Sequence, residues 1–348
     1  MMASRIATGI ILTCVASLVW AVPVARLVRV EPLALSSVAV PLDDSDPARR
    51  DVGRLRFMGG LVLRSTNAGF GGLSGLRAGP GGWFVGITDT GDWVTFRTVE
   101  AGGRLVGVTG GSIAPILDER GAPAPTKTAG DAEALEWDAA VGDATVSFEQ
   151  DHRRQTYRGI DPARPDTLRA SAIAVLRDAA TATWPSNGGG EALAALPGSR
   201  TIVFAEEGQD ATGASPVLIF GDATTRQLRY TPPRGFRPTD AQWLGGETLL
   251  VLNRRFNPVQ GVAAALTLVT LPTDGTDLAS TEIARLTPPL AVDNMEGLAV
   301  VRDAGRTFVY FVSDDNFRQL QRNLLLKFEL LSCADSGAGA ARGERRCR

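Results

Sequence analysis

The chain of 348 residues is poor in cysteine and histidine, which build transition-metal sites, and in lysine, so arginine supplies nearly all of its positive charge. It has three cysteines and one histidine, His152, which excludes a metal site made of several histidines. Lys127 and Lys327 are the only lysines, and the formal net charge is −2, so no global field attracts nucleic acid or anionic lipid. A phosphate-cradling glycine loop, a paired CxxC motif and a serine elbow are all missing. We expect no nucleic-acid partner.

Uninterrupted apolar segments are also short. The one from Ile6 to Val19 follows Arg5 and has fewer than the roughly 20 residues needed to span a bilayer. We interpret residues 1–21 as a cleaved signal peptide, with a retained anchor as the alternative. Cleavage predicts a periplasmic or secreted protein without stable membrane insertion, in which Cys333 and Cys347 could pair. The segment 331–348, rich in Gly, Ala and Arg, is expected to be disordered.

The sequence does contain a repeat of about 50 to 60 residues, the length of one four-stranded propeller blade. Each copy opens with a polar or acidic residue, in most copies followed by a small residue and leucine, and closes an apolar run with a second polar group. The copies open at Ser74, Glu133, Glu191, Asp240 and Glu296, with spacings of 59, 58, 49 and 56 residues. They close at Asp89, Glu149, Glu206, Asn253 and Asp314.

This periodicity predicts an all-β fold, a β-propeller of five or six four-stranded blades over residues 22–330. The strand pattern at 323–330 has nothing downstream to pair with, so we expect an N-terminal strand at 55–63 to close the last blade. Two long insertions, 110–130 and 161–190, interrupt the repeat and suggest binding loops. The second is predicted to hold a short helix at 168–180.

Hairpin geometry places the opening and closing residues of one copy about 5 Å apart at Cβ. Glu133 should therefore lie beside Glu149, Glu191 beside Glu206, and Glu296 beside Asp314, forming an acidic ring at one face of the channel. Two such charges about 4 Å apart repel by roughly 4 kcal/mol at an effective dielectric of 20. Protonation, a hard cation such as calcium, or arginine would neutralise the ring.

Several strings together resemble the phytase-like family, often labelled "esterase-like activity of phytase", from about residue 55 to 330. They are Asp131-Ala132-Glu133-Ala134-Leu135, Val146-Ser147-Phe148-Glu149, Asn187-Gly188-Gly189-Gly190-Glu191, Leu252-Asn253-Arg254-Arg255-Phe256, Asn294-Met295-Glu296-Gly297-Leu298 and Ser313-Asp314-Asp315-Asn316. The resemblance implies an exported bacterial propeller with phosphoester or carboxylester hydrolase activity. True propeller phytases use calcium ions held by carboxylates. Asn253 and Ser74 depart from the pattern, since each stands where an acid is expected.

The leading hypothesis is a monomeric, calcium-dependent hydrolase acting on a small anionic ester. The alternatives are a calcium-dependent lactonase-like propeller and a non-catalytic binding or scaffold propeller whose acids only tie blades together. Candidate catalytic residues are His152, Glu296 and Asp314, although His152 could simply pack. Candidate substrate-binding residues, which could equally be ion-pair partners of the acids, are Arg153, Arg154, Arg254 and Arg255. Candidate calcium ligands are Glu133, Glu149, Glu191, Glu206, Glu296, Asp314 and Asp315.

Overall fold

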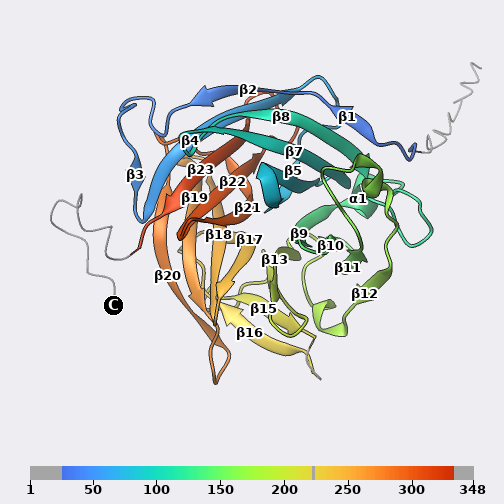
Figure 1. Ribbon diagram of the computed structural model, residues 1–348. Helices are drawn as coiled ribbons and strands as arrows, with labels where there is room; N and C mark the ends of the chain where they lie inside the picture. Colours follow the sequence, from blue (N-terminus) through green and yellow to red (C-terminus); the bar gives the residue numbers. More distant parts are fainter. Residues whose placement is uncertain (1–25, 222–223, 333–348) are drawn as a thin grey trace, which may run out of the picture.

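The computed structural model describes residues 26–221 and 224–332, and within them antiparallel strands dominate (Figure 1). They form five blades, because the one eight-stranded sheet consists of two four-stranded units joined by a parallel pairing of β16 with β20. The expected signal peptide 1–21, Cys333, Cys347 and nearly all of the expected tail lie outside the described residues.

Each blade is a meander of four antiparallel strands, which follow one another from the axis outward. Blade 1 contains β5 (Leu73–Ala78), β6 (Trp83–Thr88), β7 (Asp92–Ala101) and β8 (Arg104–Pro115). Blade 2 contains β9 (Ala132–Asp138), β10 (Asp143–Phe148), β11 (Arg153–Tyr157) and β12 (Ala174–Arg177). Blade 3 contains β13 (Gly190–Leu196), β14 (Arg200–Ala205), β15 (Ser215–Phe220) and β16 (Arg226–Tyr230). Blade 4 contains β17 (Arg237–Gly245), β18 (Thr248–Asn257), β19 (Gly261–Thr270) and β20 (Asp277–Leu286). Blade 5 contains β21 (Asn294–Asp303), β22 (Arg306–Asp314), β23 (Asn323–Leu330) and β4 (Leu55–Ser65).

An N-terminal strand closes the ring, as the sequence predicts. Strand β4 pairs antiparallel with β23 from Leu55 opposite Leu330 to Leu63 opposite Asn323, so the last blade gains its fourth strand from the start of the domain. No sixth blade forms in the part of the chain that the structure describes. Instead β1 (Glu31–Leu33) and β2 (Leu35–Val40) extend the outer edges of blades 1 and 5, and β3 (Asp51–Val52) pairs with β4 (Figure 1).

The inner strands explain why a small residue and leucine recur in the repeat. Each inner strand contacts the next in a closed circle, β5 to β9, β13, β17, β21 and back to β5. A Cβ at Gly297 would lie 3.1 Å from the Cβ of Leu76, and one at Gly75 would lie 3.0 Å from the Cβ of Leu135. The small residue is therefore required where neighbouring strands converge on the axis, and the following leucine is buried between blades.

The helices are all short and lie in connections. They are η1 (Pro80–Gly82), α1 (Lys127–Gly130), η2 (Pro165–Arg169) and η3 (Ala179–Thr181). The helix predicted at 168–180 is wrong, because this stretch contains β12, the outermost strand of blade 2, which pairs with β11. The need to complete the four-stranded meander overrides the local helical pattern of the sequence.

Candidate functional site

Each inner strand carries a β-bulge near its start. Because a bulge residue is left out of the ladder, its side chain can be aimed differently from those of its neighbours. The skipped residues are Ser74, Glu133, Glu191, Thr239 and Glu296. The fourth repeat therefore opens at Thr239, one residue before the position expected from the sequence. Asp240 lies at the next strand position and pairs instead with Arg77 on the axis.

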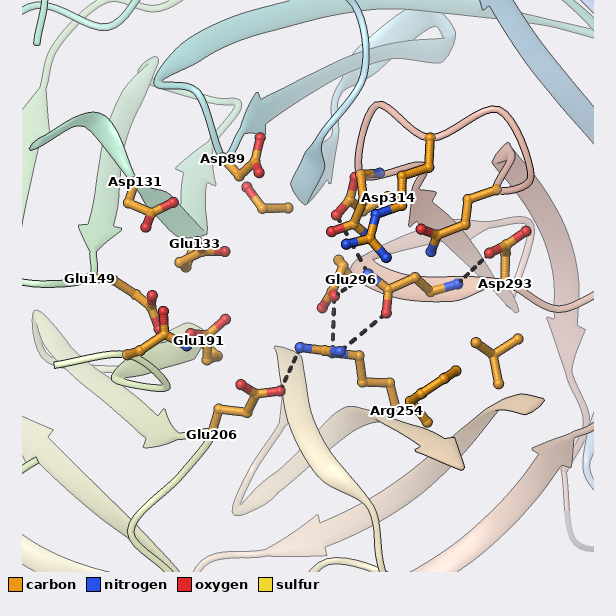
Figure 2. Close-up of a pocket in the computed structure, with 18 of the residues that line it drawn as sticks. Asp89, Asp131, Glu133, Glu149, Glu191, Glu206, Arg254, Asp293, Glu296 and Asp314 are labelled. Carbon is orange, nitrogen blue, oxygen red and sulfur yellow. Dashed lines mark hydrogen bonds and ion pairs between the residues drawn. The ribbon is translucent and has the colours of Figure 1, made fainter. Parts of the chain in front are cut away.

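Four of the five bulge residues line one cavity of about 950 Å³ at this end of the channel (Figure 2). Its ionisable lining contains nine carboxylates and three cations, so the walls are strongly acidic. The carboxylates belong to Asp89, Asp131, Glu133, Glu149, Glu191, Glu206, Asp293, Glu296 and Asp314. The cations belong to Lys127, Arg254 and Arg318. The structure thus brings together the acids that the repeat predicted would converge.

One side of the cavity holds a compact carboxylate trio. Asp131, Glu133 and Glu149 each offer an oxygen within 4.8 Å of the other two. Burial, then the charges of Glu149 and Asp131, raises the pKa of Glu133 well above its usual range. Burial, followed by the charge of Glu133, does the same to the pKa of Glu191, whose carboxyl also forms a hydrogen bond with Glu149. Carboxyl groups this close need shared protons or a bound cation.

Two glycines hold Glu149 in place. The backbone N–H groups of Gly188 and Gly189 both donate to Oε1 of Glu149, the second at 3.1 Å. Gly188 has φ of 90°, and a Cβ there would lie 2.3 Å from Cγ of Glu207, so a side chain is excluded on two grounds. This insertion loop therefore fixes one carboxylate oxygen of Glu149 through backbone donors.

The opposite side is organised by Arg254 (Figure 2). Its Nη2 lies 2.7 Å from Oε1 of Glu206, its Nε lies 2.9 Å from Oε1 of Glu296, and its Nη1 donates to Oδ1 of Asn294 at 3.2 Å. Burial raises the pKa of Glu296 to about 8 although Arg254 opposes the shift. Burial also raises the pKa of Asp314 to about 7. Both carboxyls therefore titrate near neutral pH in the cation-free protein.

A second cation reaches the cavity from the first insertion. Nζ of Lys127, at the start of α1, lies 2.8 Å from Oδ2 of Asp89 and 3.1 Å from Oδ1 of Asp131. Burial opposes the ammonium charge, but Asp89 and Asp131 together raise the pKa of Lys127. Burial likewise raises the pKa of Asp89, and its Oδ1 is buried without a hydrogen-bond partner. This oxygen lies against Gly72, where an added Cβ would be 2.1 Å from it.

Deeper along the axis, Arg77 fills the channel. It lies three residues beyond Ser74 on β5, about 10 Å further along the strand. Its guanidinium donates to Asp240 through both Nη atoms, at 2.9 and 3.1 Å, and Nε contacts Glu136 at 3.3 Å. It also donates to carbonyl oxygens of β5, β13, β17 and β21. One buried side chain thus bonds to all five inner strands and forms the floor beneath the acids.

Five of the residues predicted at the site do not line the cavity. Adjacent strand residues face opposite sides, so Arg255 points away from Arg254 and lies 5.0 Å from the ring of Phe236. The guanidinium of Arg153 lies 3.9 Å from the ring of Phe148 and binds Asp151, and that of Arg154 lies 3.6 Å from the ring of Phe220.

His152 packs behind the glycine loop. Its ring lies 6.1 Å from that of Trp184, and its Nδ1 would be 2.5 Å from a Cβ at Gly189, so the backbone separates it from the carboxylates. Asp315 accepts hydrogen bonds from Gly72 N at 3.2 Å and the Asn323 amide at 2.8 Å, which pins its loop. Neither His152 nor Asp315 is among the residues that line the cavity.

Sequence reasoning also missed functional neighbours. Asp131 lies two residues before a predicted ligand, Asp89 closes the first repeat, and Lys127 is one of only two lysines in the chain. Each of these positions is visible in the sequence and could have indicated a residue of the cavity. Asn253, the expected departure at the fourth closing position, is fully buried and bonds to Tyr230 at 2.9 Å outside the cavity.

The residues present suit a hard divalent cation. The trio offers only carboxylate oxygens, which is the donor type that calcium and magnesium prefer. Glu149 is already oriented by backbone donors, and Asp131 by the 3.1 Å contact with Lys127, as outer-shell groups orient ligands in metal sites. A bound cation would lower these raised carboxyl pKa values.

Within the described residues, no helix is long and apolar enough to cross a membrane.

Comparison with known families matches residues 68–317, most of the chain, to the phytase-like family described as "Esterase-like activity of phytase". No curated protein matches the chain.

Several solved structures of low identity also match the chain. One is a carbohydrate-active enzyme of family AA12 from Trichoderma reesei, 12% identical, TM-score 0.38, covering 90% of this chain and 99% of its own. Another is the RS223 β-xylosidase, 11% identical, TM-score 0.42, covering 78% and 94%. A third is a protein of unknown function from Dyadobacter fermentans, 12% identical, TM-score 0.40, covering 89% and 98%.

Proposed function

The chain belongs to the phytase-like family, and we propose that it is a calcium-dependent hydrolase of phosphate or carboxylate esters. The observation that carries this proposal is the juxtaposition, in one cavity, of a carboxylate trio suited to a cation with an arginine and two carboxyls that titrate near neutral pH. We further propose that it acts in the periplasm or outside the cell, because a signal peptide is expected at 1–21. We also propose that it acts as a monomer.

In this proposal Asp131, Glu133 and Glu149 hold the cation. When bound, calcium would polarise the ester and lower the pKa of a water molecule. Arg254 is fixed between two carboxylates and presents a guanidinium to the anionic group of the substrate, which suits planar or tetrahedral oxygens. Lys127 is held in the same way on the opposite wall.

Glu296 and Asp314 supply the proton in the proposed reaction. A general acid works best with a pKa near the working pH, and burial places these two carboxyls at about 8 and about 7. A protonated carboxyl can donate to the leaving oxygen as the bond to phosphorus or carbon breaks, while the attacking water forms the new bond and gives its proton to the other, ionised carboxyl. The buried Arg77 closes the far end of the channel, so the substrate reaches these carboxyls from the opposite end.

The test is hydrolysis by the protein lacking residues 1–21. Nitrophenyl phosphate, nitrophenyl acetate, phytate and a panel of sugar lactones are assayed with calcium and with chelator. We expect ester turnover that chelator abolishes and that Glu133→Gln lowers, with calcium affinity reduced at least tenfold. Glu247→Gln, an exposed carboxylate on the β17–β18 turn, is the matched control and should behave as wild type.

Three outcomes would contradict the proposal. Turnover of lactones alone would show that the substrate is a cyclic ester and would identify a lactonase-like enzyme. Turnover that persists in chelator would show that the reaction does not need a metal ion. Calcium-dependent melting without turnover of any substrate would leave a structural metal site in a binding or scaffold propeller.

A further inference from the structure

Three apolar side chains also line the cavity, beside polar ones such as Gln319 and Gln321, and we call these three its apolar mouth. Phe256 at the end of β18, Val262 near the start of β19 and Leu320 between β22 and β23 all line the same cavity as the carboxylates. Phe256 is 68% exposed and Leu320 is 96% exposed. Val259, at the tip of the β18–β19 hairpin, is 93% exposed. Large apolar side chains left in water beside a polar pocket are typical of a ligand-binding surface.

The charges of the cavity limit how much anion it can accept. Lys127 is already held by Asp89 and Asp131, and Arg254 by Glu206 and Glu296. Of the cationic side chains that line the cavity in the described residues, only Arg318 has no carboxylate within ion-pair distance. A ligand with several phosphates would meet an excess of carboxylates and few free cations, so repulsion disfavours it.

We propose, building on the ester hydrolase function above, that the substrate is amphipathic. It has one anionic or polar ester group, which reaches the trio and Arg254, and an alkyl or aryl group, which packs against Phe256, Val262 and Leu320. The cavity volume of about 950 Å³ lies within the range that encloses a ligand of this size. The acidic wall selects against polyphosphorylated substrates, and the apolar mouth supplies the binding energy that a single charge lacks.

The experiment measures binding without hydrolysis, so it does not depend on turnover. Methyl-, butyl- and octylphosphonate are titrated into calcium-loaded protein lacking residues 1–21, by calorimetry. We expect affinity to rise about two- to fourfold for each methylene that is buried. The double variant Phe256→Ala/Leu320→Ser should lose at least tenfold in affinity for octylphosphonate and far less for methylphosphonate. Phytate should bind more weakly than octylphosphonate.

Val141→Ser is the matched control, because Val141 is 63% exposed on the β9–β10 turn, at the opposite end of the inner strand from Glu133. It should leave the chain-length dependence unchanged. Equal affinity for the three phosphonates, or tighter binding of phytate, would overturn the inference even if esters are hydrolysed. Chain-length dependence that the double variant removes would support it even if no ester is turned over. Concentration-dependent dimerisation that the double variant abolishes would show instead that a second copy covers the mouth.

Discussion

Replacing Arg77 with methionine is expected to destabilise the propeller strongly, because one guanidinium bonds to every inner strand. Its side chain is only 1% exposed, and its partner Asp240 is fully buried. Asp240 also accepts hydrogen bonds from Leu298 N at 2.7 Å and Ala241 N at 2.8 Å, so its carboxylate bridges β17 and β21 even without the arginine. Methionine fills much of the same volume but leaves this carboxylate without a counter-charge.

The magnitude follows from the buried pair. Removing one partner of a buried ion pair costs about 3–5 kcal/mol, since the remaining charge is left uncompensated. The carbonyl oxygens of Leu193, Ala241 and Leu298 also lose a donor, and each unsatisfied group costs about 1 kcal/mol or more. These losses are not additive, so we expect about 4 kcal/mol or slightly more. That is a large share of the roughly 5–15 kcal/mol by which a domain is stable.

Urea unfolding of four proteins tests this. They are wild type, Arg77→Met, Asp240→Asn and the double variant. Because the double variant lacks both charges of the Arg77–Asp240 pair, no uncompensated charge is left on the axis. It should therefore be more stable than Arg77→Met alone, with a coupling free energy of about 2 kcal/mol. Arg158→Met, at an exposed arginine of blade 2, should stay within about 0.5 kcal/mol of wild type. If Arg77→Met unfolds like this control, or if the double variant is the least stable of the four, the axial role is refuted.

Three further perturbations follow from the site and the closure. In chelator, the free energy of unfolding should fall as pH rises from about 4.5 to 8. Burial raises the pKa of Glu296 from 4.5 to about 8, so between these values the folded protein holds a proton that the unfolded chain has released. Urea titrations across this range test it, and a rise in stability would contradict it. Gly188→Ala should lower calcium affinity, measured by calorimetry. The control Gly213→Ala has a similar φ of 85°, but no atom lies within 4 Å of the added Cβ, so it should lower only the stability. Equal calcium affinities of the two variants would contradict the role of the Gly188 and Gly189 N–H groups in holding Glu149. A chain that starts at Asn67 lacks β4 and leaves an edge of β23 unpaired, so it should aggregate rather than melt cooperatively; a cooperative monomer in ultracentrifugation would contradict the closure.

The fold could be predicted from the sequence because its signals are local and repeated. Alternating apolar strands, the polar or acidic residue near the start of each inner strand and the unpaired strand at 323–330 are each visible within one repeat. They specify a propeller, its closure and the convergence of Glu133, Glu191 and Glu296 on one cavity. The shift of the fourth repeat to Thr239 was not visible, because Asp240 offers an acid at a neighbouring position and bulges leave no signal in composition.

The arginine pairs show where pattern reasoning was incomplete. Successive side chains of a strand point to opposite faces, so of Arg254 and Arg255 only one could reach the cavity, and this constraint was available from the sequence. Arg77 was not predictable in the same way. It sits in an inner strand beside a buried leucine, and nothing nearby in the sequence marks the point where carbonyl groups from distant blades meet.

The cavity and the arginine floor are parts of one physical arrangement. Arg77 fills the axis below the carboxyls, and burial at this end of the channel raises the pKa values of Glu133 and Glu191 by penalising their charges. The cation-free protein therefore gives up stability at neutral pH to keep these carboxyls together. A divalent cation would recover that free energy by replacing the protons, so affinity for the cation and stability of the fold are linked through the same residues. It follows that proton release reports on the site: calcium binding at neutral pH should release protons, measured by calorimetry, and Glu133→Gln, which has no acidic proton to lose, should reduce the number released.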